Sequence, residues 1–394
     1  MNSSRQALIA LLEQMIQIES INGNEKALGE FLCEFGELHG LGVEKQYCTE
    51  DRFNVVFTYP ATPLSENKTY SLLMHGHYDT VPELDMHDPF NPVIENGYMK
   101  GRGTVDQKAG IAAGLLAIVE IKKRGLIPKR PICFAAVIDE ESEHRGSMKL
   151  VESSIQADYA IVTEPTGLQA VLGCKGTLPL KITVLGKTSH GCRPWLGVNA
   201  VEKALPILER LFSLDFEEID FGKGLGLLKN SVNVGLVKAG TAYNNVPDRC
   251  EISLDCRIIP GETNDRMKQK IQDLINEAAV EHPELQATVS TDRPDWHWAP
   301  VKERGLQSAQ TSLESDLLQL AERSHKAITG KNLSSYITDG YTDMDFIIND
   351  LKIPCIVYGP GNPRLCHTAQ EQILLDDVES ARMFYEEFIQ ENCI

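Results

Sequence analysis

The hydrophobic pattern of this chain changes its period twice. In residues 1–177, short apolar runs of strand type alternate with longer stretches whose apolar residues recur at helical spacing. Within residues 178–293, apolar and polar residues instead alternate one by one, and from residue 294 to 394 the first pattern returns. A chain of 394 residues is too long for one small core. The order of patterns therefore predicts a domain of residues 1–177 and 294–394 that is interrupted by an inserted domain of residues 178–293.

The outer segments predict an α/β fold. Their strand-like runs are residues 54–59, 71–74, 131–138, 159–162 and 353–358. Their helical stretches include residues 110–123, 313–328 and 375–389. Buried strands that alternate with helices usually form a mostly parallel sheet with helices on both faces. We expect such a sheet in the first domain.

The inserted segment predicts an α+β domain. In residues 250–259 the apolar side chains fall on every second position, which is typical of an antiparallel sheet with one face in water. Two stretches of helical periodicity, residues 199–214 and a second from Thr263 onwards, lie among these strands. Residues 293–300 lead back to the first domain, and we expect Trp296 and Trp298 to pack at that junction.

Charge and cysteine content bear on partners and compartment. The formal net charge of −18 argues against nucleic acid or an anionic membrane as a partner, because both would be repelled. No apolar run approaches the roughly 18 residues of a membrane span, and residues 1–14 lack the basic-then-apolar layout of a secretory signal. The ten cysteines include no Cys-x-x-Cys pair, and several, such as Cys133 and Cys256, lie in apolar strand-like runs and are expected to be buried free thiols. We expect a cytoplasmic protein.

Two histidines and an aspartate follow the apolar run 71–74. His77 and Asp79 are two positions apart, so in an extended chain their side chains point the same way. The carboxylate would then hold the imidazole of His77 in one tautomer, as metal-binding histidines require. His75 shares that direction, so the spacing alone leaves open which imidazole binds a metal.

Further acidic residues and one histidine occur where predicted strands end or helices begin. Each residue alone is also compatible with an ordinary helix cap, a solvated turn or a loop. Together they are more informative, because ligands of an α/β sheet bind at the carboxyl ends of its strands. The residues are Asp106, Glu140, Glu141, Glu164 and His367.

This set has the chemistry of a site for two metal ions. Two imidazoles and three carboxylates suit two borderline divalent ions such as zinc that share one bridging carboxylate. Glu140 is adjacent to Glu141 and diverges from it at the strand end, so it can face a water molecule instead. With Glu140 counted, four carboxylates balance two dications, and such a site does not repel an anionic substrate.

These segments, in this order, resemble the co-catalytic zinc aminoacylase and carboxypeptidase family. Its members include acetylornithine deacetylase, succinyl-diaminopimelate desuccinylase, aminoacylase and glutamate carboxypeptidase, and the resemblance spans nearly the whole chain. It implies that His77 and Glu164 hold one metal ion, that Glu141 and His367 hold the other, and that Asp106 bridges them. Zinc is the metal implied, with cobalt or manganese as alternatives.

The resemblance also assigns roles to residues that bind no metal. Asp79 would orient His77, Glu140 would be the general base, and His75 would be structural support. In residues 142–146 the chain departs from the family, which often has a small or apolar residue and then glycine there. His144 and Arg145 occupy that stretch as a possible cationic spot, and the sequence assigns them no role.

The inserted domain resembles the family's lid and dimerisation domain. His190 resembles the lid histidine that reaches an active site across a dimer and polarises the scissile carbonyl. Arg257 resembles the arginine that receives the substrate carboxylate. Asn244 and Asn245 both match the lid asparagine, and the sequence leaves open which one corresponds. The resemblance therefore implies a homodimer that acts on a small substrate.

The expected function is a metal-dependent deacylase. Glu140 would take a proton from a water between the metals as it attacks the amide of an N-acyl amino acid, with His190 at the oxyanion. A dipeptidase or carboxypeptidase of the same family is the alternative. A Cys–His nucleophile at Cys174 or Cys192 with His190 lacks any supporting motif. A non-catalytic relative would have lost a ligand or Glu140, and all are present.

Overall fold

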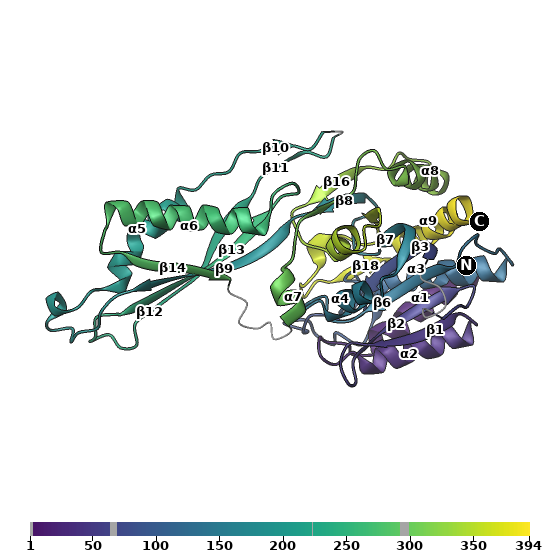
Figure 1. Cartoon of the computed structure of the whole chain (residues 1–394). Coiled ribbons are helices and arrows are strands. Elements are labelled where there is room, and N and C mark those ends of the chain that lie inside the picture. Colours follow the sequence, from purple (N-terminus) through teal and green to yellow (C-terminus); the bar gives the residue numbers. More distant parts are fainter. Residues whose placement is uncertain (1–2, 64–68, 223, 292–298) are drawn as a thin grey trace. The chain divides into compact units, whose positions relative to one another are not determined.

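In the computed structural model, strands from both ends of the sequence join one mixed sheet (Figure 1). The structure describes residues 3–63, 69–222, 224–291 and 299–394. Trp296 and Trp298 lie outside the described residues.

The chain divides into two units. The first comprises Met1–Gly173, Gln310–Ile337 and Thr342–Ile394. The second comprises Cys174–Ala309 and Thr338–Tyr341. The first unit therefore draws on both termini, and the second is almost continuous in sequence.

Within the described residues, the large sheet has nine strands. Their order is β1 (Gly42–Tyr47), β2 (Phe53–Tyr59), β6 (Ile132–Val137), β3 (Thr69–His77), β7 (Gln156–Val162), β17 (Cys355–Val357), β8 (Ala170–Cys174) and β15 (Ala309–Gln310), with β16 (Ser335–Thr338) also paired to β8. The central strands β6, β3, β7 and β17 are parallel, whereas β1, β2 and β8 pair antiparallel with their neighbours. The predicted mostly parallel sheet is confirmed, with antiparallel strands towards both edges.

Helices connect and cover these strands. The helices of the first unit are α1 (Ser3–Gln17), α2 (Lys26–Leu38), α3 (Lys108–Lys123), α4 (Arg145–Glu152), α8 (Leu317–Thr329) and α9 (Leu375–Cys393), with a π-helix η2 (Phe346–Asp350) and a 3-10 turn η3 (Pro363–Leu365). From β3 the chain crosses by α3 to β6 on one side and returns by α4 to β7 on the other. Because such crossovers are right-handed, α3 and α4 lie on opposite faces, and the chain order reverses at β3, which is where ligands bind in sheets of this kind.

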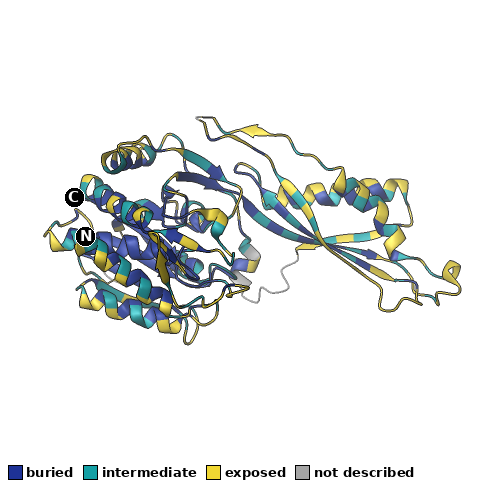
Figure 2. Cartoon of the chain, turned by 180° about the vertical axis from the view of Figure 1, so that it is seen from behind, coloured by how far each residue is buried: buried dark blue, intermediate teal, exposed yellow. Residues whose placement is uncertain are grey.

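The core lies where α3 meets the central strands. Every residue of β2 and β6 is buried, and so is nearly all of α3 (Figure 2). Two glycines let α3 approach the sheet closely: a Cβ at Gly110 would lie 2.1 Å from the carbonyl oxygen of Thr163, and one at Gly114 would lie 2.4 Å from the ring of Phe134. This close approach sets the start of α3 beside the end of β7.

The second unit has a separate antiparallel sheet. Its strand order is β12 (Ser231–Ala239), β13 (Arg249–Ile258), β9 (Gly176–Leu185) and β14 (Gln286–Thr291). Alternate residues of β9 and β13 are buried against α5 (Ala200–Phe212) and α6 (Asn264–Glu281), as the alternating pattern predicted. Asn199 and Thr263 cap the two helices, since their side chains accept backbone N–H groups of the first turns.

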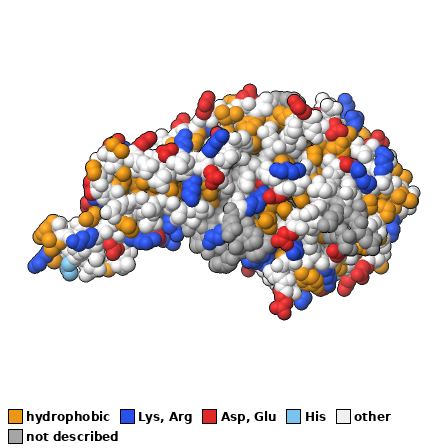
Figure 3. Space-filling view, in the orientation of Figure 1, with side chains coloured by type: hydrophobic (Ala, Val, Ile, Leu, Met, Phe, Trp, Pro, Cys, Tyr) orange, Lys and Arg blue, Asp and Glu red, His pale blue; other side chains and the backbone are white. Residues whose placement is uncertain are grey.

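The remaining elements are short. They are the sheet β18 (Gln372–Leu374), β5 (Tyr98–Lys100) and β4 (Val93–Glu95), the pair β10 (Ile219–Asp220) and β11 (Leu227–Leu228), the helix α7 (Ala299–Arg304) and the 3-10 turn η1 (Pro194–Leu196). Among the described helices, none combines the length and apolar character that crossing a membrane requires. On the face drawn in Figure 3, acidic and basic side chains are interspersed, so neither sign of charge dominates it.

Candidate metal centre

The five predicted ligands come together in the first unit. His77 is the last residue of β3, Glu141 and Glu164 follow β6 and β7, and the loop after β17 carries His367. Asp106 comes from the loop that precedes α3. Since β3, β6, β7 and β17 are parallel, their carboxyl ends lie along one edge of the sheet, and this gathers the side chains.

The carboxylate of Asp106 lies between two histidines. Its Oδ1 is 3.0 Å from Nε2 of His77, and its Oδ2 is 3.2 Å from Nε2 of His367. Nε2 of His77 is also 3.4 Å from Oε1 of Glu164, and Nε2 of His367 is 2.9 Å from Oε1 of Glu141. The site therefore consists of two halves, His77 with Glu164 and His367 with Glu141, which share Asp106.

The electrostatics of this cluster favour positive charge. Burial opposes ionisation of His77, but Glu164 and Asp106 raise its pKa well above the usual value. Hydrogen bonding to Asp106 and Glu141 raises the pKa of His367 to about 10. Burial raises the pKa of Glu164 to about 7, against the pull of His77. Carboxylates crowded in a buried site repel one another unless cations lie among them.

The donor set fits two divalent ions. His77 and Glu141, one from each half, and the shared Asp106 have ligand atoms within 4.8 Å of one another, so the two halves adjoin. Each half offers an imidazole nitrogen, one carboxylate of its own and one oxygen of the shared carboxylate. Three protein ligands and an open position are the arrangement of catalytic rather than structural zinc sites.

Asp79 stabilises two parts of the site at once. Nδ1 of His77 lies 3.0 Å from the backbone oxygen of Asp79 and 3.4 Å from its Oδ1. The carboxylate also accepts the backbone N–H groups of Glu140 and Glu141, at 3.2 and 3.1 Å, and the amide of Asn22. The expected contact with His77 is thus shared between the main chain and side chain of Asp79. The contact with the acidic turn was not foreseen, because it depends on β3 and β6 being neighbours.

The turn that carries Glu140 is held tightly. Asp139 adopts a left-handed conformation with φ 70°, and its buried carboxylate accepts hydrogen bonds from Asn22 and Arg52. At the other end, a Cβ at Gly146 would lie 2.5 Å from the carbonyl oxygen of Ile138, so only glycine fits. Burial, above all, raises the pKa of Glu140 well above its usual value.

Two residues that the sequence reasoning missed support the ligands. Glu371 accepts the backbone N–H groups of Val105 and Asp106, at 2.9 and 3.2 Å, and pairs with the buried Arg102. The amide of Gln107 donates to Glu164. Their positions beside Asp106 and shortly after His367 were the only signal available in the sequence.

His75 lies outside the ligand cluster. Its Nε2 is 2.8 Å from Oγ of Ser147, and its Nδ1 has no hydrogen-bond partner in the described part of the chain. Burial lowers the pKa of His75 to about 4, so the ring is neutral. This placement agrees with a structural role.

The expected cationic spot beside the acidic pair is paired with carboxylates. Arg145 Nη2 lies 2.8 Å from Oε2 of Glu143, and Nδ1 of His144 lies 2.8 Å from Oδ1 of Asp343. The sequence could not reveal this pairing for His144, since Asp343 is distant in the chain.

The predicted lid residues lie in the second unit. His190 and Asn245 form an isolated antiparallel bridge, and the N–H of Gly191 donates to the carbonyl of Asn244 at 2.6 Å. The two lid motifs are therefore neighbours, and His190 is exposed. Arg257 lies on β13, where its Nε is 3.1 Å from the carboxylate of Asp255.

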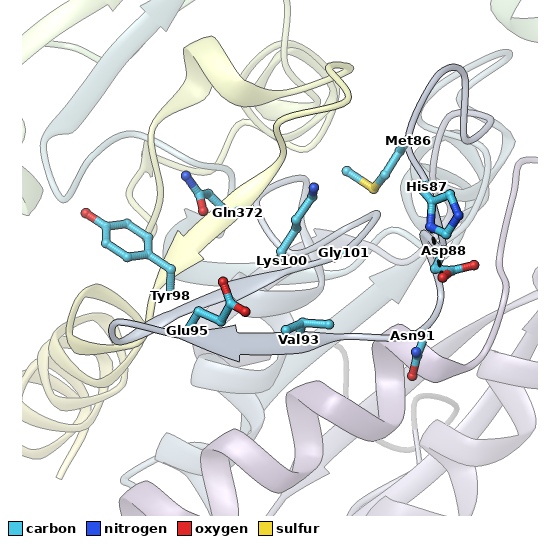
Figure 4. A pocket seen from close by; sticks show the side chains of 10 residues that line it. All are labelled: Met86, His87, Asp88, Asn91, Val93, Glu95, Tyr98, Lys100, Gly101 and Gln372. Carbon is cyan, nitrogen blue, oxygen red and sulfur yellow. Dashed lines mark ion pairs between the residues drawn. The ribbon is translucent and has the colours of Figure 1, made fainter.

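A surface hollow of about 310 Å³ lies beside β4 and β5 (Figure 4). Tyr98, Lys100 and Gln372 line it on one side, and the paired His87 and Asp88 line it on the other. None of the five predicted metal ligands is among its lining residues.

Comparison with known proteins identifies relatives over the full length. A model of peptidase family M20/M25/M40 matches residues 73–391. A probable carboxypeptidase of Aspergillus clavatus is 28% identical over 401 residues, covering 97% of this chain and 88% of that protein. A probable succinyl-diaminopimelate desuccinylase of Staphylococcus aureus is 24% identical, covering 95% of this chain and 96% of that protein.

Solved structures show the same fold. A tripeptidase from Staphylococcus aureus has a TM-score of 0.79 with 22% identity, and the match covers 98% of both chains. A metallo-carboxypeptidase from Sulfolobus solfataricus has a TM-score of 0.75 with 19% identity, and the match covers 99% of both chains.

Proposed function

This chain belongs to peptidase family M20/M25/M40 and is a metallohydrolase, and we propose that it cleaves the amide bond of N-acyl amino acids with two bound metal ions. One observation carries the proposal: the two oxygens of Asp106 face two different histidines. A carboxylate in that position can bridge two cations. The ligands lie at the carboxyl ends of the parallel strands, which is where sheets of this kind bind their substrates.

We propose the ligand set that the resemblance implies. His77 and Glu164 would hold one ion, Glu141 and His367 would hold the other, and Asp106 would bridge them. Zinc suits the mixture of nitrogen and oxygen donors, and cobalt or manganese would be accepted by the same donors. Bound there, the two ions would polarise the scissile carbonyl and lower the pKa of a nearby water.

The chain's own residues would move the proton. Glu140 would take a proton from the attacking water and deliver it to the leaving nitrogen. The buried turn of Asp139, and the N–H groups of Glu140 and Glu141 that Asp79 accepts, would keep Glu140 in place during both steps. Asp79 would also keep Nε2 of His77 available for a metal ion, because it occupies the other ring nitrogen.

We propose that the second unit is a lid and dimerisation domain. His190 would bind the oxygen of the scissile carbonyl, and Asn244 or Asn245 would contact the substrate beside it. Arg257 would bind the substrate carboxylate in a forked geometry that lysine cannot provide. In the structure Asp255 occupies one edge of that guanidinium, so a substrate carboxylate would bind to the groups left over or displace it.

The proposed homodimer would form through the second unit. Strand β12 is an edge strand of its sheet, and it exposes Leu236 and Val237. An exposed apolar edge strand favours pairing with another chain. Light scattering should give twice the chain mass of 43.7 kDa, and Leu236→Lys should shift the equilibrium to the monomer. A monomer at all concentrations would contradict the dimer.

A dipeptidase or carboxypeptidase is the second candidate function. The similar proteins bear both kinds of name, since a probable carboxypeptidase and a probable desuccinylase each match almost the whole chain. Arg257 suits a substrate with a free carboxylate in either case. We further propose a cytoplasmic location, because all ten cysteines are free thiols.

A hydrolysis panel tests these proposals. N-acetylornithine, N-succinyl-diaminopimelate, other N-acyl amino acids and dipeptides would each be assayed with zinc, cobalt and manganese. A higher kcat/KM for an N-acyl amino acid than for any dipeptide is expected. The reverse order would favour the peptidase. A chain that binds two ions and hydrolyses none of the substrates would contradict both.

A further inference from the structure

A second buried cluster of polar side chains lies in the first unit. Asp343 is fully buried and accepts from two donors: Nδ1 of His144 at 2.8 Å on Oδ1, and the hydroxyl of Ser147 at 2.5 Å on Oδ2. Because the single proton of Ser147 points to Asp343, its oxygen accepts from Nε2 of His75, 2.8 Å away. None of these four residues belongs to the proposed ligand set. The proposed metal site therefore does not account for this cluster.

The cluster reaches the acidic turn through Glu140. Ligand atoms of Glu140, His144 and Asp343 all lie within 4.8 Å of one another. Two carboxylates, Glu140 and Asp343, therefore lie close together in largely buried surroundings, where like charges repel strongly. The ring of His144 contributes a donor to this group.

The backbone fixes that ring in place. His144 adopts a left-handed conformation with φ 54° immediately before α4, and its N–H donates to the carbonyl of Asp139 at 2.6 Å. Its ring lies against Phe346, with ring centroids 5.9 Å apart. The imidazole is thus held from the turn, from η2 and from Asp343 at once. A side chain held in this way can fix the position of its neighbour.

We propose that His144 and Asp343 are a positioning pair for Glu140. Asp343 holds the ring of His144 beside Glu140, and the held ring would limit how far the Glu140 carboxylate can move. Without the ring, the Glu140 carboxylate would have room to move, and repulsion from Asp343 would turn it away from the attacking water. This inference rests on the proposed role of Glu140 as the general base.

The test uses the metal-loaded full-length chain and three variants. His144→Ala should lower kcat by about 10- to 100-fold, because a misplacement of about 1 Å at a reacting group has an effect of that size. Asp343→Asn should lower kcat less than His144→Ala, because the asparagine keeps an oxygen for Nδ1 of His144 and removes the charge that repels Glu140. KM and the content of two metal ions per chain should remain those of the wild type. His144→Gln keeps a side-chain donor for Asp343 and should recover most of the lost kcat. Wild-type kcat in His144→Ala, or loss of a metal ion from it, would overturn the proposal.

A matched control comes from another buried histidine of the same unit. His325 lies on α8, and its Nδ1 is 3.0 Å from the hydroxyl of Tyr358. His325→Ala also removes a buried imidazole that bonds to a neighbouring side chain. It should lower the melting temperature as His144→Ala does and leave kcat unchanged. An equal loss of kcat in both variants would show that the effect is merely structural.

A double-mutant cycle separates failure of this inference from failure of the proposed function. Glu140→Asp withdraws the carboxylate by one methylene. In that variant, His144→Ala should lower kcat by a much smaller factor than it does in the wild type. If His144→Ala lowers kcat by the same factor in the wild type and in Glu140→Asp, His144 does not act through Glu140. Wild-type kcat in Glu140→Ala would instead contradict the proposed function itself.

Discussion

The two halves of the metal centre differ in how firmly their histidines are held. The side chain of His77 is 1% exposed, and the main chain of Asp79 fixes its ring. The side chain of His367 is 49% exposed and comes from a loop that follows a single 3-10 turn. A side chain that is already held in place before a metal ion binds loses less conformational entropy on binding it. The comparison predicts that, of the two ions proposed, the one beside His77 would be held firmly and the one beside His367 would exchange more readily.

The largest effect should come from the residue that both halves share. Asp106→Ala removes the bridge, so both ions should be lost and activity should fall by more than about 10⁴-fold, because the metal and general-base contributions disappear together. Metal analysis of the purified variant would check this. Retention of one ion beside His77 would mean that the halves are less dependent on each other than their geometry indicates.

The next effect should come from a residue that belongs to neither half. Glu140→Ala should lower kcat by roughly 10²- to 10⁴-fold, the usual contribution of general acid–base catalysis. Metal content should stay at two ions per chain, measured by plasma mass spectrometry. Loss of an ion would place Glu140 among the ligands and would change the division between the halves.

A smaller effect should fall on the firmly held half alone. Gln107→Ala removes the amide that donates to Glu164. It should lower the affinity for the ion beside His77 by about 10- to 100-fold, as is usual when a hydrogen-bond partner of a metal ligand is removed. Competition with a fluorescent chelator would measure it. Thr368→Ala, beside His367, is the control, because among the contacts described the hydroxyl of Thr368 bonds to the backbone oxygen of Leu365 and the backbone N–H of Gln370 and to none of the proposed ligands. An equal loss of metal affinity in both variants would contradict the role of Gln107 as a partner of the ligand Glu164.

The smallest effect concerns the wild-type chain. Stepwise addition of a chelator should release two ions in separate phases whose affinities differ by about tenfold, with the ion at His367 leaving first. A cobalt-substituted sample would report each phase by its visible spectrum. Release of both ions in one phase would contradict the difference in affinity that we predict from the exposures of His77 and His367.

The sequence was informative where a signal is local. Apolar runs mark the ends of β3, β6 and β7, so His77, Glu141 and Glu164 could be found from the residues beside them. Asp343 could not, because its partner His144 lies 199 positions away and nothing near either residue marks the pairing. The contact of Asp79 with the backbone of Glu140 was equally hidden, since it follows from strand order rather than from spacing. Contacts between residues that are distant in the sequence depend on the order of the strands in the folded sheet, so no local pattern reveals them.

The place where the second unit enters the chain has an evolutionary consequence. The chain leaves the large sheet at β8 and returns at β15, and these two strands are neighbours. A segment whose two ends meet can be lengthened, exchanged or trimmed without altering the pairing of β3, β6, β7 and β17. Mutation and recombination could therefore remodel the second unit, and with it the proposed lid residues, while the candidate metal centre is inherited intact.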